Sequence, residues 1–304
     1  MRIEYNGIDI APDVSVQYAA ATDTEGGCGD SVCVQFTDVD ELWPRWRPVQ
    51  GDTLRLVEGQ FDSGIMYVDR IALSDGACEL EAVSIPPDAR GPRYQAWESI
   101  AFGRLAAEIA QRHGLSVSIY DAPDVTYPRL QQYGEGDLEY LAHRCTLEGC
   151  AMKVRSGTLV IYDQRVRESS APVKSIDLGR SVGYFYEDRA ADRLKSYAVL
   201  SGAISALCRD ESGEVCRGGA RAERKTAAYS VGEAQRYARG LLRGVNKMAR
   251  TLTLTCEMEN IYAAGEVVTV EGNRLAAGRW FVSRVDYDFT ANTVRLKLRG
   301  CLDW

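Results

Sequence analysis

The sequence lacks most of the signatures that reveal a function in a single chain. Its nine Cys contain no C-x-x-C pair, and it has only two His, His113 and His143. No apolar run reaches the roughly 18 to 20 residues needed to cross a bilayer, and the first residues carry no signal-peptide pattern. These absences predict a protein made in the cytoplasm, without membrane anchoring and without a disulfide framework.

Metal-ligand and nucleophile motifs are also missing. Two groups come closest to the spacing of zinc ligands, namely Cys28 with Cys33 and His143 with Cys145 and Cys150. On a helix, Cys145 falls on an apolar face, so we interpret it as a small buried hydrophobic residue. There is no G-x-S-x-G, P-loop, dinucleotide fingerprint or H-E-x-x-H motif, and we interpret the Gly-rich stretch at 26–29 as a flexible loop. We therefore expect no catalytic residue, no cofactor and no metal.

Carboxylates are the remaining candidates for chemistry. Glu135, Asp137 and Glu139 stand close together, but two of them lie at a predicted helix start, where the helix macrodipole favours acidic residues. The alternative to a structural protein is a cell-wall hydrolase, which would use a pair of carboxylates among Glu98, Glu108, Glu135 and Asp137.

The composition of the chain is that of a folded protein with an uneven charge distribution. Its 304 residues are 45% hydrophobic and 26% charged, enough for one large domain or two to three smaller ones. Residues 1–150 carry 11 Lys and Arg against 25 Asp and Glu, a net charge of −14, whereas residues 151–304 carry 25 against 18, a net charge of +7. The opposite net charges of the two halves can steer one copy of the chain onto another, or the charged residues can simply be solvated. The first half would repel free nucleic acid.

The hydrophobic pattern divides the chain into three regions. Within residues 1–90, apolar and polar residues alternate with period two at 53–57, 65–71 and 77–83, which predicts a barrel-like β domain. Residues 91–172 are expected to form a small α+β domain. Its predicted elements are an apolar helical stripe from Trp97 to Ala110 that ends at Gly114, a strand at 115–120, a helix at 138–148 that stops at Gly149, and a hairpin about Ser156-Gly157.

Residues 173–304 predict a second barrel-like β domain. Strands are expected near 194–200 and at 251–256, 266–270, 279–289 and 293–299, with an inserted loop at 201–229 that includes a Gly-rich stretch at 208–220. A helix at 230–249 interrupts them, and Ser230 to Glu233 fits a capping box. The predicted fold class is therefore mostly β with α+β, in which two barrel-like domains flank a small α+β domain and one long amphipathic helix lies in the C-terminal part.

This amphipathic helix carries the candidate interface. Its apolar stripe is expected to pack on a β domain and contains Val231, Ala234, Tyr237, Ala238, Leu241, Leu242, Val245 and Met248. The opposite stripe contains Arg236, Arg239, Arg243 and Lys247. Such a stripe could bind phosphates, but it lacks interleaved aromatic residues. We expect it to face solvent, a channel or an acidic surface of a neighbouring subunit.

Several segments together resemble one protein family. The run from Leu130 to Leu141, LQQYGEGDLEYL, is followed by Glu148-Gly149 and by a hairpin containing Thr158-Leu159-Val160-Ile161. Upstream, Ile85-Pro86-Pro87 and the stretch 106–114 match the linker and first helix of that family. The chain resembles the phage late control protein D family, the tail baseplate hub, most strongly from about 60 to 165.

The resemblance implies a structural role. Members of that family join a hexameric tail tube to a trimeric central spike, so the implied partners are further copies of this chain in a homotrimer, the tail tube protein, the spike and other baseplate proteins. The implied location is the baseplate of a phage or phage-tail-like particle that is assembled in a bacterial host. The matching motifs are packing motifs, and they carry no catalytic residue. A carbohydrate- or nucleic-acid-binding β-protein is the third possibility.

Overall fold

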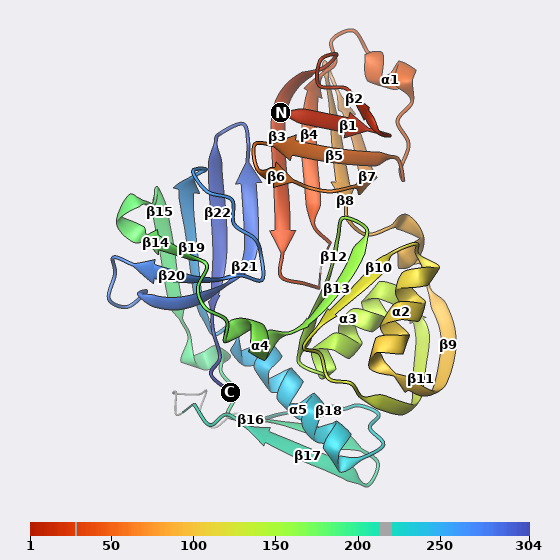
Figure 1. Ribbon diagram of the computed structural model, residues 1–304, viewed down its shortest axis with the longest axis vertical. Helices are drawn as coiled ribbons and strands as arrows, with labels where there is room; N and C mark the ends of the chain where they lie inside the picture. Colours follow the sequence, from red (N-terminus) through yellow and green to blue (C-terminus); the bar gives the residue numbers. More distant parts are fainter. Residues whose placement is uncertain (28, 213–220) are drawn as a thin grey trace.

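The structure is a computed structural model that describes residues 1–27, 29–212 and 221–304 (Figure 1). The described chain is mostly β-strand, and its buried apolar side chains form two large hydrophobic cores and one small cluster. Among the described residues, no helix is long and apolar enough to cross a membrane.

The first core is built by strands from both ends of the chain. The N-terminal elements are β1 (Arg2–Tyr5), β2 (Ile8–Asp9), β3 (Ser15–Thr24), β4 (Ser31–Thr37), α1 (Leu42–Trp46), β5 (Thr53–Glu58), β6 (Phe61–Asp62), β7 (Met66–Ser74) and β8 (Ala77–Val83). The C-terminal elements are β14 (Lys174–Asp177), η2 (Leu178–Arg180), β15 (Gly183–Asp188), η3 (Ala190–Asp192), β19 (Arg250–Glu257), β20 (Val267–Glu271), β21 (Gly278–Asp288) and β22 (Thr293–Gly300).

These two groups of strands share one sheet, which corrects the expectation of two separate barrel-like domains. In the described part of the chain, 14 strands join in the order β15-β19-β22-β21-β3-β4-β8-β7-β5-β1-β2, with β14, β20 and β6 as side branches, and the sheet does not close into a barrel. The connection is the antiparallel pairing of β21 with β3, from Arg284 opposite Thr24 to Asp288 opposite Ala20. One hydrophobic core runs through both groups, from Ile3 to Leu298.

The second core belongs to the α+β part of the chain. Its elements are η1 (Pro87–Arg90), β9 (Arg93–Ala101), α2 (Phe102–Arg112), β10 (Ser116–Tyr120), β11 (Thr126–Glu135), α3 (Asp137–Leu147), β12 (Cys150–Arg155), β13 (Thr158–Asp163) and α4 (Gln164–Glu168). Helices α2 and α3 lie between the three-stranded sheet β10-β13-β12 and the ribbon β9-β11 (Figure 1).

The prediction of helix from Trp97 to Ala101 was wrong, because these residues belong to β9. Ser99 has a left-handed backbone with φ 51°, and neither Ser99 nor Pro128 opposite it is paired, although the register with β11 is the same on both sides of them. Trp97 and Ile100 are therefore both buried although they are three residues apart. Three is also the spacing of one helical face, which explains why the pattern indicated a helix.

Residues 196–246 fold with the second core rather than with the β-sheet. They form β16 (Ser196–Ser201), β17 (Ile204–Arg209), β18 (Arg221–Lys225) and α5 (Val231–Asn246), so the expected loop 201–229 contains two strands. The expected Gly-rich stretch falls partly at 213–220, outside the described residues. Helix α5 lies between α3 and the sheet β17-β16-β18, and its buried side chains join those of α2 and α3. Helix α5 thus packs on β16 and β17, which lie in the predicted second β domain at 173–304, and also on α3 of the α+β domain.

The two ends of α5 also differ from the prediction in detail. The Ser230 hydroxyl accepts a hydrogen bond from the Glu233 N–H at 3.1 Å, as a capping box requires, whereas the Glu233 carboxylate accepts from Tyr229 N–H at 2.8 Å. Ala234, Tyr237, Ala238, Leu241 and Leu242 are buried. Val231, Val245 and Met248 are 62%, 38% and 48% exposed, so the apolar stripe is narrower than expected.

Candidate functional site

A cluster of buried charges lies where the two cores meet. It consists of Glu25, Glu168, Arg243, Lys247 and Arg299, and we call it the junction cluster. Glu25 follows β3, Glu168 ends α4, Arg243 and Lys247 lie on or next to α5, and Arg299 lies on β22. The cluster therefore joins the N-terminal strands, the α+β region and the C-terminal strands at one point.

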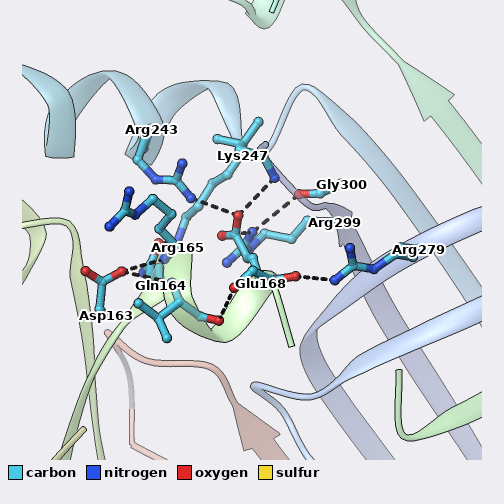
Figure 2. Close-up of polar contacts among 12 residues, drawn as sticks. Asp163, Gln164, Arg165, Glu168, Arg243, Lys247, Arg279, Arg299 and Gly300 are labelled. Atoms are coloured by element: carbon cyan, nitrogen blue, oxygen red, sulfur yellow. Dashed lines mark hydrogen bonds and ion pairs between the residues drawn. The ribbon is translucent and has the colours of Figure 1, made fainter. Parts of the chain in front are cut away.

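Glu168 lies at the centre of this cluster (Figure 2). Its carboxylate accepts hydrogen bonds from Arg243 Nη2 and Arg299 Nη1, both at 2.8 Å, and from the backbone N–H of Leu302 at 2.9 Å. Its backbone carbonyl accepts from Arg279 Nη2 at 2.7 Å. Only 1% of the Glu168 side chain is exposed, so protein donors replace the water that an exposed carboxylate would bind.

Glu25 completes the cluster from the other side. Its carboxylate accepts from Arg299 Nε at 3.1 and 2.9 Å and from Lys247 Nζ at 3.1 Å. Arg299 is fully buried and stacks over the Phe281 ring, with its guanidinium carbon 4.1 Å from the ring centroid. Burial would lower the pKa of Arg299, but the carboxylates of Glu25 and Glu168 raise it.

The cluster holds three cations against two carboxylates. Burial lowers the pKa of both Lys247 and Arg243, and nearby Arg299 lowers both further. Buried pairs of this kind add little net stability, but removal of one partner is costly because a charge is left uncompensated. The arrangement therefore links residues of the two cores by ion pairs whose loss from one side would be costly.

A second polar contact joins the same regions. Lys153 on β12 bonds to Asp23 on β3 and lies 3.5 Å from Asp30. Next to it, the N–H of Gly27 donates to the Met152 carbonyl at 3.2 Å, and a Cβ on Gly26 would come within 2.8 Å of the same oxygen. Gly26 and Gly27 are thus docked on β12, whereas the sequence suggested a flexible loop. Cys28 lies outside the described residues.

The structure places the four candidate interface residues differently from the prediction. Arg236 bonds to Glu148 on the C-terminal side of α3 at 2.8 Å, Arg243 is buried in the junction cluster, and Lys247 pairs with Glu25 there with its side chain 16% exposed. Arg239 alone of the four is exposed. The expectation that the stripe faces outward was therefore wrong for Arg243 and Lys247, because acidic residues of the same chain cover them. An interface role for the remaining basic surface stays a prediction.

Sequence reasoning missed three members of the cluster. On β22, Leu296 and Leu298 point to one face of the strand and Arg299 to the other, which period-two patterning assigns to solvent. It is nevertheless 0% exposed, because the end of α4 carries Glu168 onto that face. Glu25 and Glu168 stand in loops or short helices without any repeat, and no local signal could have found them.

One of the candidate hydrolase carboxylates, Asp137, is held by several side chains of the protein. Asp137 is buried. Its carboxylate accepts hydrogen bonds from Arg112 at 2.6 Å and from Gln132 at 3.0 Å, and it is also hydrogen-bonded to His113 Nε2 at 2.9 Å. These donors hold the pKa of Asp137 below its ordinary value in spite of burial. The other ring nitrogen of His113 bonds Asp88 at 2.7 Å, so neither nitrogen is free to act as a base.

Two cysteines of the α+β region, Cys145 and Cys150, are core residues. Cys145 and Cys150 are 1% and 2% exposed, which confirms the interpretation of Cys145 as a small buried side chain. Burial raises the pKa of both thiols, which disfavours the thiolate that a metal binds. Within the described residues, no three His, Cys, Asp or Glu side chains group as a metal site would require.

Comparison with known proteins gives one relative in sequence and several in fold. No protein-family model matches the chain. A probable baseplate hub protein of Escherichia phage 186 is 26% identical over 187 residues, which are 57% of this chain and 47% of that protein. The chain thus spans about half the length of this curated relative.

Solved structures are similar over nearly the whole chain. The tail protein from Neisseria meningitidis MC58 has a TM-score of 0.77 at 14% identity and covers 98% of this chain and 95% of its own. The 43 kDa tail protein of prophage MuSo2 from Shewanella oneidensis has a TM-score of 0.77 at 12% identity, with 98% and 97% covered. The resemblance to phage baseplate hub proteins is therefore confirmed, and the fold is that of phage tail proteins.

Proposed function

We propose that this protein is a structural baseplate hub of a contractile phage tail or phage-tail-like particle. In this role three copies form a ring that joins the hexameric tail tube to the trimeric central spike and contacts other baseplate proteins. The chain is made in the bacterial host and becomes part of the assembled particle. The observation that carries the proposal is the agreement between the partial sequence match to a baseplate hub protein and the full-length fold match to tail proteins.

The architecture of the chain supports an adaptor. The sheet shared by the two ends of the chain and the junction cluster hold the β-strands and the α+β region in one arrangement. Three copies would bring six groups of strands around one axis, which suits a six-fold tube on one side and a three-fold spike on the other. A rigid subunit keeps those surfaces in register.

The decisive experiment measures the mass of the assembled species. The purified protein is mixed with the tube and spike proteins of its own particle and examined by light scattering at low and high salt. We expect a complex that contains three copies of this chain. A chain that stays monomeric with both partners, at high concentration and low salt, would contradict the proposal. The isolated chain serves as the control, since partners are part of the assembly.

We also propose that the protein is not an enzyme. The carboxylate of Asp137 is occupied by basic and amide donors, and Glu108 accepts from Trp97 and Arg104 at 3.1 and 3.0 Å. A peptidoglycan zymogram tests this directly. Clearing by the wild-type protein that a Glu135→Gln change abolishes would favour the hydrolase instead.

A further inference from the structure

A basic pocket lies beside the junction cluster. Its volume is about 250 Å³, and it is bounded by α5, the C-terminal side of α3 and the start of α4. Charged side chains dominate its lining, namely Glu148, Asp163, Arg165, Arg236, Arg239 and Arg243. Four guanidinium groups therefore face two carboxylates.

The close approach of α5 to α3 forms the wall of this pocket. Gly240 lies so near the last turn of α3 that a Cβ would come 2.5 Å from the Leu147 carbonyl and 2.9 Å from the Gly149 nitrogen. The partial negative charge at the C-terminal end of α3 offsets part of the positive charge. It is equivalent to only about half an elementary charge, so it does not balance the remaining excess.

Both carboxylates in the pocket are already in use. Glu148 accepts from Arg236 at 2.8 Å and from the Tyr127 hydroxyl at 2.9 Å. Asp163 caps α4 by accepting from the N–H groups of Arg165 and Val166 at 2.7 and 3.1 Å. Neither carboxylate pairs with the guanidinium groups of Arg165 or Arg239.

Three guanidinium groups have donors to spare. The side chains of Arg165 and Arg239 make no hydrogen bond or ion pair with the part of the chain that the structure describes. Arg243 is 4% exposed. Its Nη2 is bonded to Glu168, but its buried Nη1 has no hydrogen-bond partner there. Buried donors normally bond to protein or to ordered water, and this nitrogen bonds to no described residue.

We propose that this pocket binds one oxyanion, a carboxylate or a phosphate group. Arginine recognises such groups through paired N–H donors in a planar fork, and the pocket has room for one such group but is smaller than the usual site of a larger ligand. The oxyanion comes either from the solution, as phosphate, or from an acidic side chain of a docked protein segment. The site lies within one chain, so this proposal does not depend on the proposed hub function.

The experiment uses the full chain and two probes at matched ionic strength. Inorganic phosphate is titrated by calorimetry against sodium chloride, and a short peptide rich in Glu and Asp is titrated against the same peptide carrying Gln and Asn. We expect saturable binding of at least one probe, weakened at least tenfold by Arg239→Gln and by Arg165→Gln. Arg129→Gln, an exposed arginine on β11 away from the pocket, is the matched control and should bind like wild type.

The probe that binds identifies the source of the oxyanion. Saturable binding of phosphate alone assigns the site to a free anion, and binding of the acidic peptide alone assigns it to a docked segment. Absence of saturable binding of either probe overturns the proposal. Unchanged affinity in both pocket variants also overturns it, since the anion would then bind elsewhere. Both replaced side chains lie at the surface of the pocket, and melting curves of the variants establish that they remain folded.

Discussion

Replacing Glu168 by Gln tests the junction cluster most directly. The change keeps the size of the side chain and removes one of the two carboxylates that face the three cations of the junction cluster. In the wild-type protein this carboxylate accepts from Arg243 and Arg299 at 2.8 Å and from Leu302 N–H at 2.9 Å. The amide NH₂ of Gln would instead place a donor against a guanidinium donor. Breaking a buried ion pair from one side typically costs about 3 to 5 kcal/mol, so we expect the free energy of unfolding to fall by that amount.

Urea denaturation followed by circular dichroism measures this loss, provided that the slope with denaturant is unchanged. Glu187→Gln is the matched control, because Glu187 pairs with Arg189 at 2.7 Å on the surface, where the side chains are 32% and 59% exposed. Exposed pairs contribute at most about 1 kcal/mol. A double variant, Glu168→Gln with Arg243→Leu, restores the original net charge of the cluster and should recover part of the loss. The reasoning is refuted if Glu168→Gln is as stable as the control, or if the double variant loses the sum of both single changes.

Three further predictions concern packing and pH. Gly240→Ala should destabilise the protein, because its Cβ would lie 2.5 and 2.6 Å from the last carbonyl oxygens of α3. The control is Gly244→Ala on the same helix, whose Cβ would meet nothing within 4 Å and which should stabilise the protein by about 0.5 to 1 kcal/mol. The melting temperatures of the two variants are compared. Leu241→Ala should cost about 2 to 5 kcal/mol because Leu241 is buried, and stability equal to wild type in urea would show that this face is misassigned. Burial raises the pKa of Asp30 from its ordinary 3.8 to about 6. The folded state therefore holds this proton more tightly, and the contribution of Asp30 to the free energy of unfolding falls as pH rises from about 4 to about 6. The stability of Asp30→Asn relative to wild type should rise by roughly 2 kcal/mol across that range, and a stability difference independent of pH would contradict this.

The sequence alone predicted those features of the structure that depend on residues close together in the chain. The hairpin formed by β12 and β13 turns at Ser156 and Gly157, both with positive φ, as the Ser-Gly pair predicted. Gly149 ends α3 with φ 76°, which a residue with a Cβ adopts only with strain. Turn and cap preferences act within a few residues of the chain, so they can be read from one sequence without knowledge of the fold.

The pairing that organises the first core could not be read in this way. β3 and β21 are separated by more than half of the chain, and their register depends on which strands find each other after collapse. Each strand alternates well enough to be predicted alone, but alternation does not specify a neighbour. Two β domains were therefore expected where one shared sheet exists. Arg299 shows the same limit for the site, since its burial depends on Glu168 from a distant helix.

The uneven charge of the two halves has a consequence that a count of charges could not show. Acidic residues of the first half meet basic residues of the second within one chain, as Glu25 with Lys247 and Arg299 and as Glu148 with Arg236. A sum over a sequence carries no distances, so it cannot separate contacts inside a subunit from contacts between subunits. Buried pairs are screened little by salt, whereas exposed charges are screened over about 10 Å at 0.1 M ionic strength. In the proposed assembly, salt should therefore weaken contacts made through exposed residues such as Arg239 at concentrations that leave the fold of each chain intact.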